Sequence, residues 1–386
     1  MASRAQRSTV NEWWWTVDRL LLVALFALML IGVVLLLAAS PAVAERIGID
    51  NMFHFVNRQA MFIVPAVVVM IGVSFLSPHA IRRTALIVFA LSVILVVATL
   101  LFGAEVKGSR RWIFGIQPSE FLKPSFVVLA AWLFSESAKR PDVPGNILAV
   151  LLLASSVTLL ILQPDFGQTM LISFVWAALF FMAGLHWFWV IGLGGVGFSG
   201  IVAAYFLIPH VTGRIDRFLN PEGSDTFQVD TAMESFLGGG WLGKGPGEGT
   251  VKRILPDSHT DFIMAVTAEE FGILFCMLLV LLFAFVVLRG LWHAHKLDDP
   301  FCRFATAGLI LLFGLQSTIN LMVNLHMMPA KGMTLPFISY GGSSLIAVAY
   351  AMGMVLALTR RRPRSDVIAR TWSFRDRAAS LGAEPA

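Results

Sequence analysis

The stretch Leu255–Ile263 places two carboxylates and a histidine immediately before a long apolar run, Phe262–Val287. Ionisable side chains at the mouth of a membrane helix are costly to remove from water, so their presence there indicates a functional role. A single well-placed carboxylate can act as a general base that takes a proton from a reacting hydroxyl group. Asp261, the last ionisable residue before the apolar run, is therefore the candidate reacting group, and His259 lies close before it.

A second pair of ionisable residues, Glu120 and Lys123, stands three positions apart at the start of another apolar run. On a helix this spacing places both side chains on one face, where they can form an ion pair. The pair could be purely structural, or it could orient Asp261 or bind an anionic part of a substrate.

Further carboxylates lie inside or between apolar runs. Glu269 and Glu270 could mark an ion or proton path, could be protonated, or could pair with a basic residue of another helix. Asp165, in the polar turn 163–168, could line the same cavity as Asp261 or cap the following helix.

Two polar, glycine-containing segments carry further candidates. Residues 238–250 satisfy only the beginning of a phosphate-loop motif, because Gly245 stands where Ser or Thr is required, and no strand precedes them. Their glycines could instead let backbone amides approach a substrate or the membrane surface, or could simply make the loop flexible. In the segment 331–344, Lys331 and serines such as Ser339 could line an active-site cavity, while the small residues could serve close helix packing.

The elements that position these residues are membrane helices. The 386-residue chain is 57% hydrophobic and 14% charged, with a mean hydropathy of +0.77. A water-soluble protein of this length could not bury so much apolar surface, whereas a bilayer solvates it. We therefore expect an all-α polytopic membrane protein with about ten transmembrane helices, at Leu20–Ser40, Ala60–Leu76, Thr84–Phe102, Phe121–Phe134, Ile147–Leu162, Gly167–Gly184, Trp187–Ile208, Phe262–Val287, Phe304–Val323 and Ser339–Leu358. Two of these, Phe121–Phe134 and Ile147–Leu162, are shorter than the roughly 17–25 residues that a spanning helix needs, so each could be extended by flanking residues or inserted only partly.

Both ends of the chain are basic, so the positive-inside rule places both in the cytoplasm. This gives a cytoplasmic N-terminal tail, 1–19, a transmembrane domain, 20–358, and a basic cytoplasmic C-terminal tail, 359–386. A large extracytoplasmic loop, 209–260, then lies between spans 7 and 8. It is far longer than an ordinary connection and lacks the composition of a disordered tail, so we expect it to be functional.

Many cations lie in or beside the loops that this topology places outside, against the usual bias. They are Lys107, Arg110, Arg111, Lys123, Arg214, Arg217, Lys244, Lys252, Arg253 and Lys331. Guanidinium and ammonium groups bind phosphate directly, so these residues could hold a phosphate-bearing substrate or anionic lipid head groups. The net charge of +5 reflects membrane topology and does not indicate nucleic-acid binding. The cysteines, Cys276 and Cys302, lack metal-ligand spacing, and no dedicated metal site is evident, although a divalent cation could assist phosphate chemistry.

These motifs together resemble the SEDS family (shape, elongation, division and sporulation) of membrane glycosyltransferases. The matching segments run in order along most of the membrane region: Arg111–Ile113, Gln117–Lys123, Gln163–Gly167, Leu255–Ile263, Glu269–Gly272 and Leu335–Ser344. The segments Gly243–Gly249, Val251–Arg253 and Lys331–Thr334 look more like the division-specific branch of the family than like its elongation branch.

The resemblance implies polymerisation of lipid II at the outer face of the bacterial inner membrane, at the division septum. The acceptor's GlcNAc 4-hydroxyl would attack C1 of the MurNAc at the undecaprenyl-pyrophosphate end of the growing strand, with Asp261 as general base and inversion at C1. Cations would stabilise the pyrophosphate leaving group. The substrate-binding and orienting residues would be drawn from Arg110, Arg111, Glu120, Lys123, Arg214, Arg217, His259, Lys331 and Ser339. Expected partners are a class B penicillin-binding transpeptidase and divisome regulatory proteins.

Two functions of other classes would suit parts of this pattern. A lipid II flippase would also have many spans and intramembrane carboxylates, but it needs a site near the bilayer midplane that opens to both faces. A scaffold that only recruits a transpeptidase would tolerate substitution of Asp261. Because the polar groups gather at the outer loops, we favour the polymerase.

Overall fold

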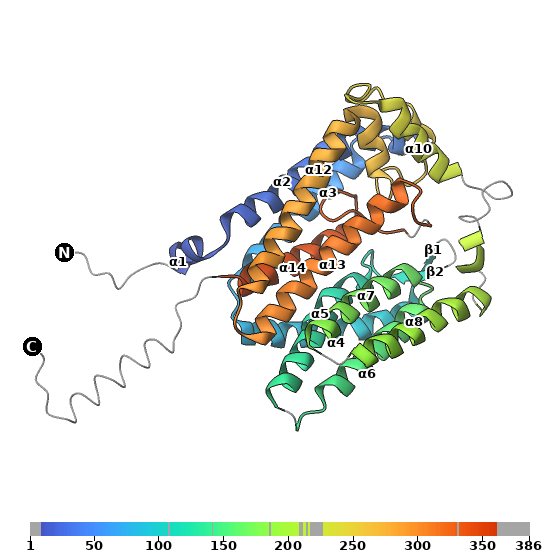
Figure 1. Cartoon of the computed structure of the whole chain (residues 1–386). Helices are drawn as coiled ribbons and strands as arrows, with labels where there is room; N and C mark the ends of the chain where they lie inside the picture. Colours follow the sequence, from blue (N-terminus) through green and yellow to red (C-terminus); the bar gives the residue numbers. More distant parts are fainter. Residues whose placement is uncertain are drawn as a thin grey trace, which may run out of the picture.

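The computed structural model describes residues 9–106, 109–140, 142–184, 187–207, 211–213, 215–216, 227–329 and 332–360. The described chain forms a bundle of long helices (Figure 1). Helix α1 (Thr9–Thr16) and the last turn of α14 lie at one end, called here the terminal end; α10 (Phe227–Gly239) and a β-hairpin lie at the other, the distal end.

Each of the ten predicted spans corresponds to one helix. These are α2 (Arg19–Arg46), α3 (His54–Ser74), α4 (Pro78–Phe102), α5 (Pro118–Lys139), α6 (Gly145–Leu162), α7 (Phe166–Met182), α8 (Trp187–Leu207), α12 (Ile263–His295), α13 (Pro300–Asn324) and α14 (Gly342–Leu358). Seven of them are long and apolar enough to cross a membrane by themselves; α5 carries charged residues, and α7 and α14 have 17 residues each. The polytopic helical fold is thus confirmed, and flanking polar residues extend the short fourth run into a 22-residue helix.

Strands occur in one place among the described residues. Strands β1 (Ala104–Val106) and β2 (Ser109–Trp112) pair antiparallel between α4 and α5. This hairpin was not predicted from the sequence. Between α8 and α12, the long loop contains α10 and the single turn α11 (Val251–Ile254).

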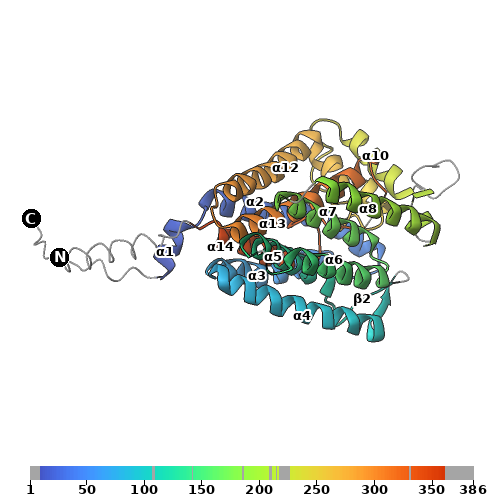
Figure 2. The same ribbon diagram turned by 60° about the horizontal axis from the view of Figure 1, so that its bottom comes forward.

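Helix α5 lies at the centre of the bundle, in contact with α4, α6, α7, α13 and α14 (Figure 2). Its buried side chains include Leu122, Phe126 and Phe134. Small residues let neighbouring elements approach closely: a Cβ on Gly353 of α14 would lie 2.7 Å from the Met70 carbonyl oxygen of α3. Close backbone approach at small residues is the usual packing mode of membrane helices.

Asp18 links two helices at the terminal end. Its carboxylate caps α2 by accepting hydrogen bonds from the Leu20 and Leu21 amides, at 3.0 and 3.1 Å. It also accepts a 2.7 Å bond from Arg289 of α12 and contacts His293. Burial alone would raise the pKa of Asp18, but the hydrogen bonds from His293 and Arg289 hold it well below its usual range. The Asp18 carboxylate therefore links the start of α2 to α12.

At the distal end, helix α12 is broken at Gly272, whose φ of 80° and ψ of 174° are not helical. In an unbroken helix, the amides of Ile273 and Leu274 would donate to the carbonyls of Glu269 and Glu270. The glycine-rich loop, residues 238–250, satisfies these four groups instead. Ile273 donates to Gly240 (3.0 Å) and Leu274 to Trp241 (3.3 Å), while the amides of Lys244 and Gly245 donate to the Glu269 and Glu270 carbonyls at 2.8 and 3.0 Å. Irregular backbone is tolerated in a membrane protein where other protein groups satisfy it in this way.

We expect Gly243→Ala to separate the glycine-rich loop from α12. Gly243 has a φ of +79°, and a Cβ there would lie 2.2 Å from the Glu270 carbonyl oxygen. Left-handed strain and overpacking together should cost about 2–5 kcal/mol of the free energy of unfolding. Gly247→Ala is the matched control, because its φ is +90° but no described atom lies within 4 Å of the added Cβ. Equal losses of melting temperature in the two purified variants would contradict the close contact.

Candidate active site

Asp261 lies at the distal end, two residues before α12 begins. Its side chain is half-buried, and its carboxylate would be 3.6 Å from a Cβ placed on Gly332. The segment that follows α13 therefore returns directly past the candidate base.

The main chain of Asp261 is held by two amides of α13. The side-chain nitrogens of Asn320 and Asn324 each donate to the Asp261 carbonyl at 2.9 Å, and Asn320 also donates to the Met333 carbonyl at 2.6 Å. Both asparagines are buried. Because these bonds join the backbone, they fix the position of Asp261 and leave its carboxylate for other contacts.

The residues before Asp261 are held by the segment that leads into α14. The Ser339 hydroxyl donates to the Thr260 carbonyl at 2.5 Å, and the Tyr340 amide donates to the His259 carbonyl at 2.9 Å. The predicted site residues Ser339 and His259 therefore lie at the same place as Asp261. The imidazole of His259 packs against Phe55, with ring centroids 4.4 Å apart.

Helix α2 holds the start of the same segment. Arg46 donates to the Leu255 carbonyl at 2.6 Å. Residues 255–261 thus follow an irregular path whose carbonyls are bound by α2, by α13 and by the segment before α14. This arrangement preorganises Asp261, which is what a general base requires.

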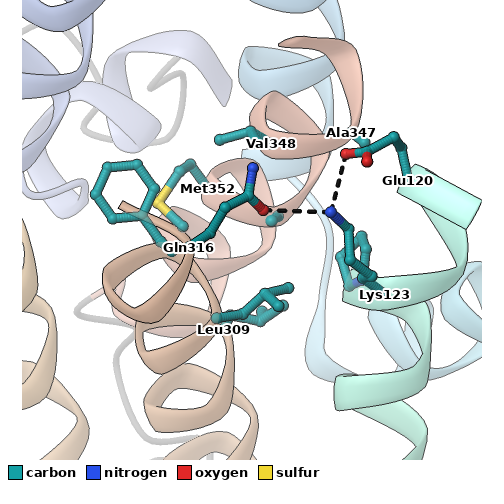
Figure 3. A pocket seen from close by; sticks show the side chains of 11 residues that line it. Glu120, Lys123, Leu309, Gln316, Ala347, Val348 and Met352 are labelled. Carbon is teal, nitrogen blue, oxygen red and sulfur yellow. Dashed lines mark hydrogen bonds and ion pairs between the residues drawn. The ribbon is translucent and has the colours of Figure 1, made fainter. Parts of the chain in front are cut away.

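Glu120 and Lys123 form the predicted ion pair, with Lys123 Nζ 3.0 Å from Glu120 Oε2, and both are buried. Gln168 of α7 donates to the other Glu120 oxygen at 2.8 Å, and Lys123 also donates to Gln316 of α13 at 3.2 Å. Figure 3 shows the Lys123 ammonium between the Glu120 carboxylate and the Gln316 oxygen, at a small hollow that apolar residues of α13 and α14 also line. The pair is thus built into the junction of α5, α7 and α13.

Helix α13 connects this pair with the Asp261 segment. Gln316 binds Lys123 through its oxygen and donates from its nitrogen to the Thr334 carbonyl at 3.0 Å, and Asn320 and Asn324 follow at intervals of one turn. These three side-chain amides were not predicted from the sequence. Their signal was present, because polar side chains at i, i+4 and i+8 of an apolar run share one helix face.

The two predicted arginines of the hairpin differ in their surroundings. Arg111 donates to the carbonyls of Gln163 and Pro164 and lies 3.4 Å from Asp165, so it fastens the hairpin to the α6–α7 turn. Arg110 is half-exposed, 3.6 Å from Glu105. Asp165 itself accepts from the Gln168 amide and caps α7.

Each of the two adjacent glutamates forms an ion pair with a lysine. Glu269 pairs with Lys244 at 2.9 Å, and Glu270 pairs with Lys252. Of the alternatives left open from the sequence, pairing with a basic residue is the one observed. The lysines come from the long loop and α11 instead of another spanning helix.

Four of the predicted outer cations, Lys107, Arg214, Arg217 and Lys331, lie outside the described residues. Within the described ranges, no group of three or more His, Cys, Asp or Glu side chains is arranged to hold a metal ion.

The family model described as "Cell cycle protein", named for FtsW, RodA and SpoVE, matches residues 18–363. The chain belongs to this family. The resemblance to the SEDS proteins drawn from the sequence is thereby confirmed.

Curated members of the FtsW/RodA/SpoVE family align along nearly all of the chain. The "Probable peptidoglycan glycosyltransferase FtsW" of Caulobacter vibrioides is 49% identical over 365 residues, which cover 94% of each chain. The protein of the same name from Trichlorobacter lovleyi is 32% identical and covers 89% of this chain and 93% of its own length.

Solved structures of related proteins share the fold. A chain from a study of "structural coordination of polymerization and crosslinking by a peptidoglycan synthase complex" superposes with a TM-score of 0.75 at 27% identity, covering 91% of this chain and 100% of that one. The rod shape determining protein RodA of Thermus thermophilus gives a TM-score of 0.67 at 27% identity, covering 91% and 99%.

Proposed function

We propose that this chain is a peptidoglycan glycosyltransferase that polymerises lipid II into glycan strands during septal wall synthesis. The observation that carries the proposal is the distal-end site, where three separate parts of the fold fix the Asp261 segment at the mouth of a membrane helix. The glycosyltransferase name and FtsW assignment of its relatives support the same function and favour the division role over elongation.

In the proposed reaction, the acceptor's 4-hydroxyl oxygen forms a bond to C1 of the donor sugar while the bond from C1 to the pyrophosphate oxygen breaks. Asp261 takes the hydroxyl proton, and the pyrophosphate leaves with the bonding electron pair. We propose that Arg110, which is half-exposed in the hairpin at the same end and 3.6 Å from Glu105, binds that anion, whereas Arg111 and Lys123 support the site through their protein contacts. Arg214, Arg217 and Lys331 remain candidates for the same anion from the sequence alone.

The proposed topology puts the distal end outside the cytoplasmic membrane and the terminal end in the cytoplasm. This orientation agrees with the positive-inside rule, because many basic residues lie at the terminal end: Arg19, Arg82, Arg83, Lys139, Arg140, Arg289, Lys296, Arg303 and Arg360. A lipid-linked donor held in the membrane plane could then reach the distal site from the outer leaflet. Proposed partners are a class B penicillin-binding transpeptidase, in keeping with the polymerisation and crosslinking complex that shares this fold, and divisome regulators.

The carrier alternative receives less support. It drew on Glu269 and Glu270 as possible intramembrane transport groups, but both carboxylates are already paired with lysines and loop amides.

Incubation with labelled lipid II tests the proposal. We expect the purified chain, together with a transpeptidase partner, to produce a ladder of glycan polymer that a muramidase cuts back to disaccharide units. A partner inactivated in its transpeptidase site should give the same ladder, because polymerisation belongs to this chain. Absence of polymer together with lipid II transfer across liposome membranes would instead identify a carrier.

A further inference from the structure

Four charged side chains form a cluster beside the break in α12. Glu269 and Glu270 of α12 are fully buried, Lys252 of α11 is 4% exposed, and Lys244 belongs to the glycine-rich loop. We call Lys244, Lys252, Glu269 and Glu270 the clamp. Burying ion pairs costs desolvation energy that apolar packing would avoid, so a clamp of this kind is poorly explained by stability alone.

The Glu269 half of the clamp organises the start of α11. Its carboxylate accepts from Lys244 Nζ (2.9 Å), from the Thr250 amide (2.8 Å) and from the Val251 amide (3.1 Å). Thr250 is the residue before α11 and Val251 is its first residue, and the amide donors at the start of a helix need partners. Glu269 therefore fixes the position of the N-terminus of α11.

The Glu270 half of the clamp binds α11 to two other elements. Lys252 Nζ contacts Glu270 Oε1 and donates to the Ala38 carbonyl of α2 and to the Gly247 carbonyl, each at 3.0 Å. The Gly247 amide in turn donates to the other Glu270 oxygen at 2.9 Å. Lys252 is thus bound by α12, by α2 and by the glycine-rich loop at once.

The two members of this ion pair are placed symmetrically about the candidate base. Lys252 precedes Asp261 by nine residues, and Glu270 follows it by nine. The contact between them therefore closes the segment 252–270 into a loop with Asp261 at its midpoint. Closing a chain segment at both ends reduces the conformations available to its middle.

We infer that the Lys252–Glu270 ion pair is a positioning device that holds Asp261 in its catalytic place. This inference rests on the proposed glycosyltransferase function. The bonds from α13, α2 and the segment before α14 fix individual carbonyls of residues 255–261. The Lys252–Glu270 pair fixes the chain on either side of these residues. Lys252 and Glu270 are positioning residues, because they act on Asp261 through the backbone.

The test compares Lys252→Met with the double variant Lys252→Met/Glu270→Gln in full-length protein. The single variant leaves a buried carboxylate without its cation and could fail to fold, whereas the double variant removes both charges and should recover the melting temperature. Lys139→Met is the matched control: its ion pair with Asp299 at the terminal end is 2.7 Å long but well exposed. Two measurements are made on each protein, hydrogen–deuterium exchange of peptides covering 255–262 and the kcat and KM of lipid II polymerisation.

We expect the double variant to exchange residues 255–262 at least about tenfold faster than wild type, with kcat lowered at least about tenfold and KM little changed. Lys139→Met should match wild type in both measurements. Unchanged exchange at 255–262 would overturn the inference, as would faster exchange with a wild-type kcat. If wild type itself makes no polymer, the proposed function fails, and the exchange result alone decides whether the clamp orders this segment.

Discussion

Asp261→Asn is expected to lower the kcat of lipid II polymerisation by about 10²–10⁴-fold, the usual contribution of general-base catalysis. The amide has nearly the shape of the carboxylate but cannot take the acceptor's proton. The fold should persist, because Asn320 and Asn324 bind the main-chain carbonyl of residue 261 and not its side chain. Melting temperature and initial rate, measured on the same preparation, check both halves of the expectation.

Asp257→Asn is the matched control for this variant. Asp257 is a half-buried carboxylate in the same segment, and its φ of 55° is one that asparagine tolerates. We expect its rate to stay within about threefold of the wild-type rate, because a conservative substitution away from the reacting group has a small effect. If Asp261→Asn kept a tenth or more of the wild-type rate, another group would have to be the base.

Lys123→Met should be the most destabilising single substitution at the site. Among the described residues, it leaves the buried Glu120 carboxylate with the Gln168 side-chain amide as its one remaining side-chain partner, and breaking a buried ion pair in this way costs about 3–5 kcal/mol. The measurement is the melting temperature of the purified variants.

The double variant Glu120→Gln/Lys123→Met removes the orphaned charge and should regain most of the lost stability. Lys139→Met, which breaks an exposed ion pair, should cost less than about 1 kcal/mol. A Lys123→Met protein as stable as wild type would show that Glu120 and Lys123 are not coupled. Polymerisation by the stable double variant then tells whether the pair also takes part in activity.

Local patterns in the sequence were sufficient to predict most of the fold. Long apolar runs predicted the ten helices, and the three-residue spacing of Glu120 and Lys123 predicted their ion pair. Both signals depend on residues within a few turns of one another, which is the range over which helix geometry fixes side-chain direction. Extension of the short fourth run by flanking residues was one of two expected outcomes, but the bounds of α5 could not be predicted from the apolar run because its first turn is polar and its last turn carries Lys139.

Contacts between distant parts of the chain could not be predicted in the same way. The glycine-rich loop suggested a substrate-facing or flexible segment, yet its amides satisfy the broken backbone of α12 at Gly272. Nothing local in the sequence distinguishes Lys244 and Lys252, which pair with Glu269 and Glu270, from cations that face a substrate. Likewise, Asn320 lies 59 residues from the Asp261 carbonyl that it binds.

The pH dependence of polymerisation tests most directly whether Asp261 is the base. For wild type we predict that log kcat/KM falls with unit slope on the acidic side of the profile, because protonation of one carboxylate removes the acceptor for the hydroxyl proton. The residual activity of Asp261→Asn should lack this slope, while Asp257→Asn should retain it. The same acidic slope in wild type and in Asp261→Asn would contradict the assignment of Asp261 as general base.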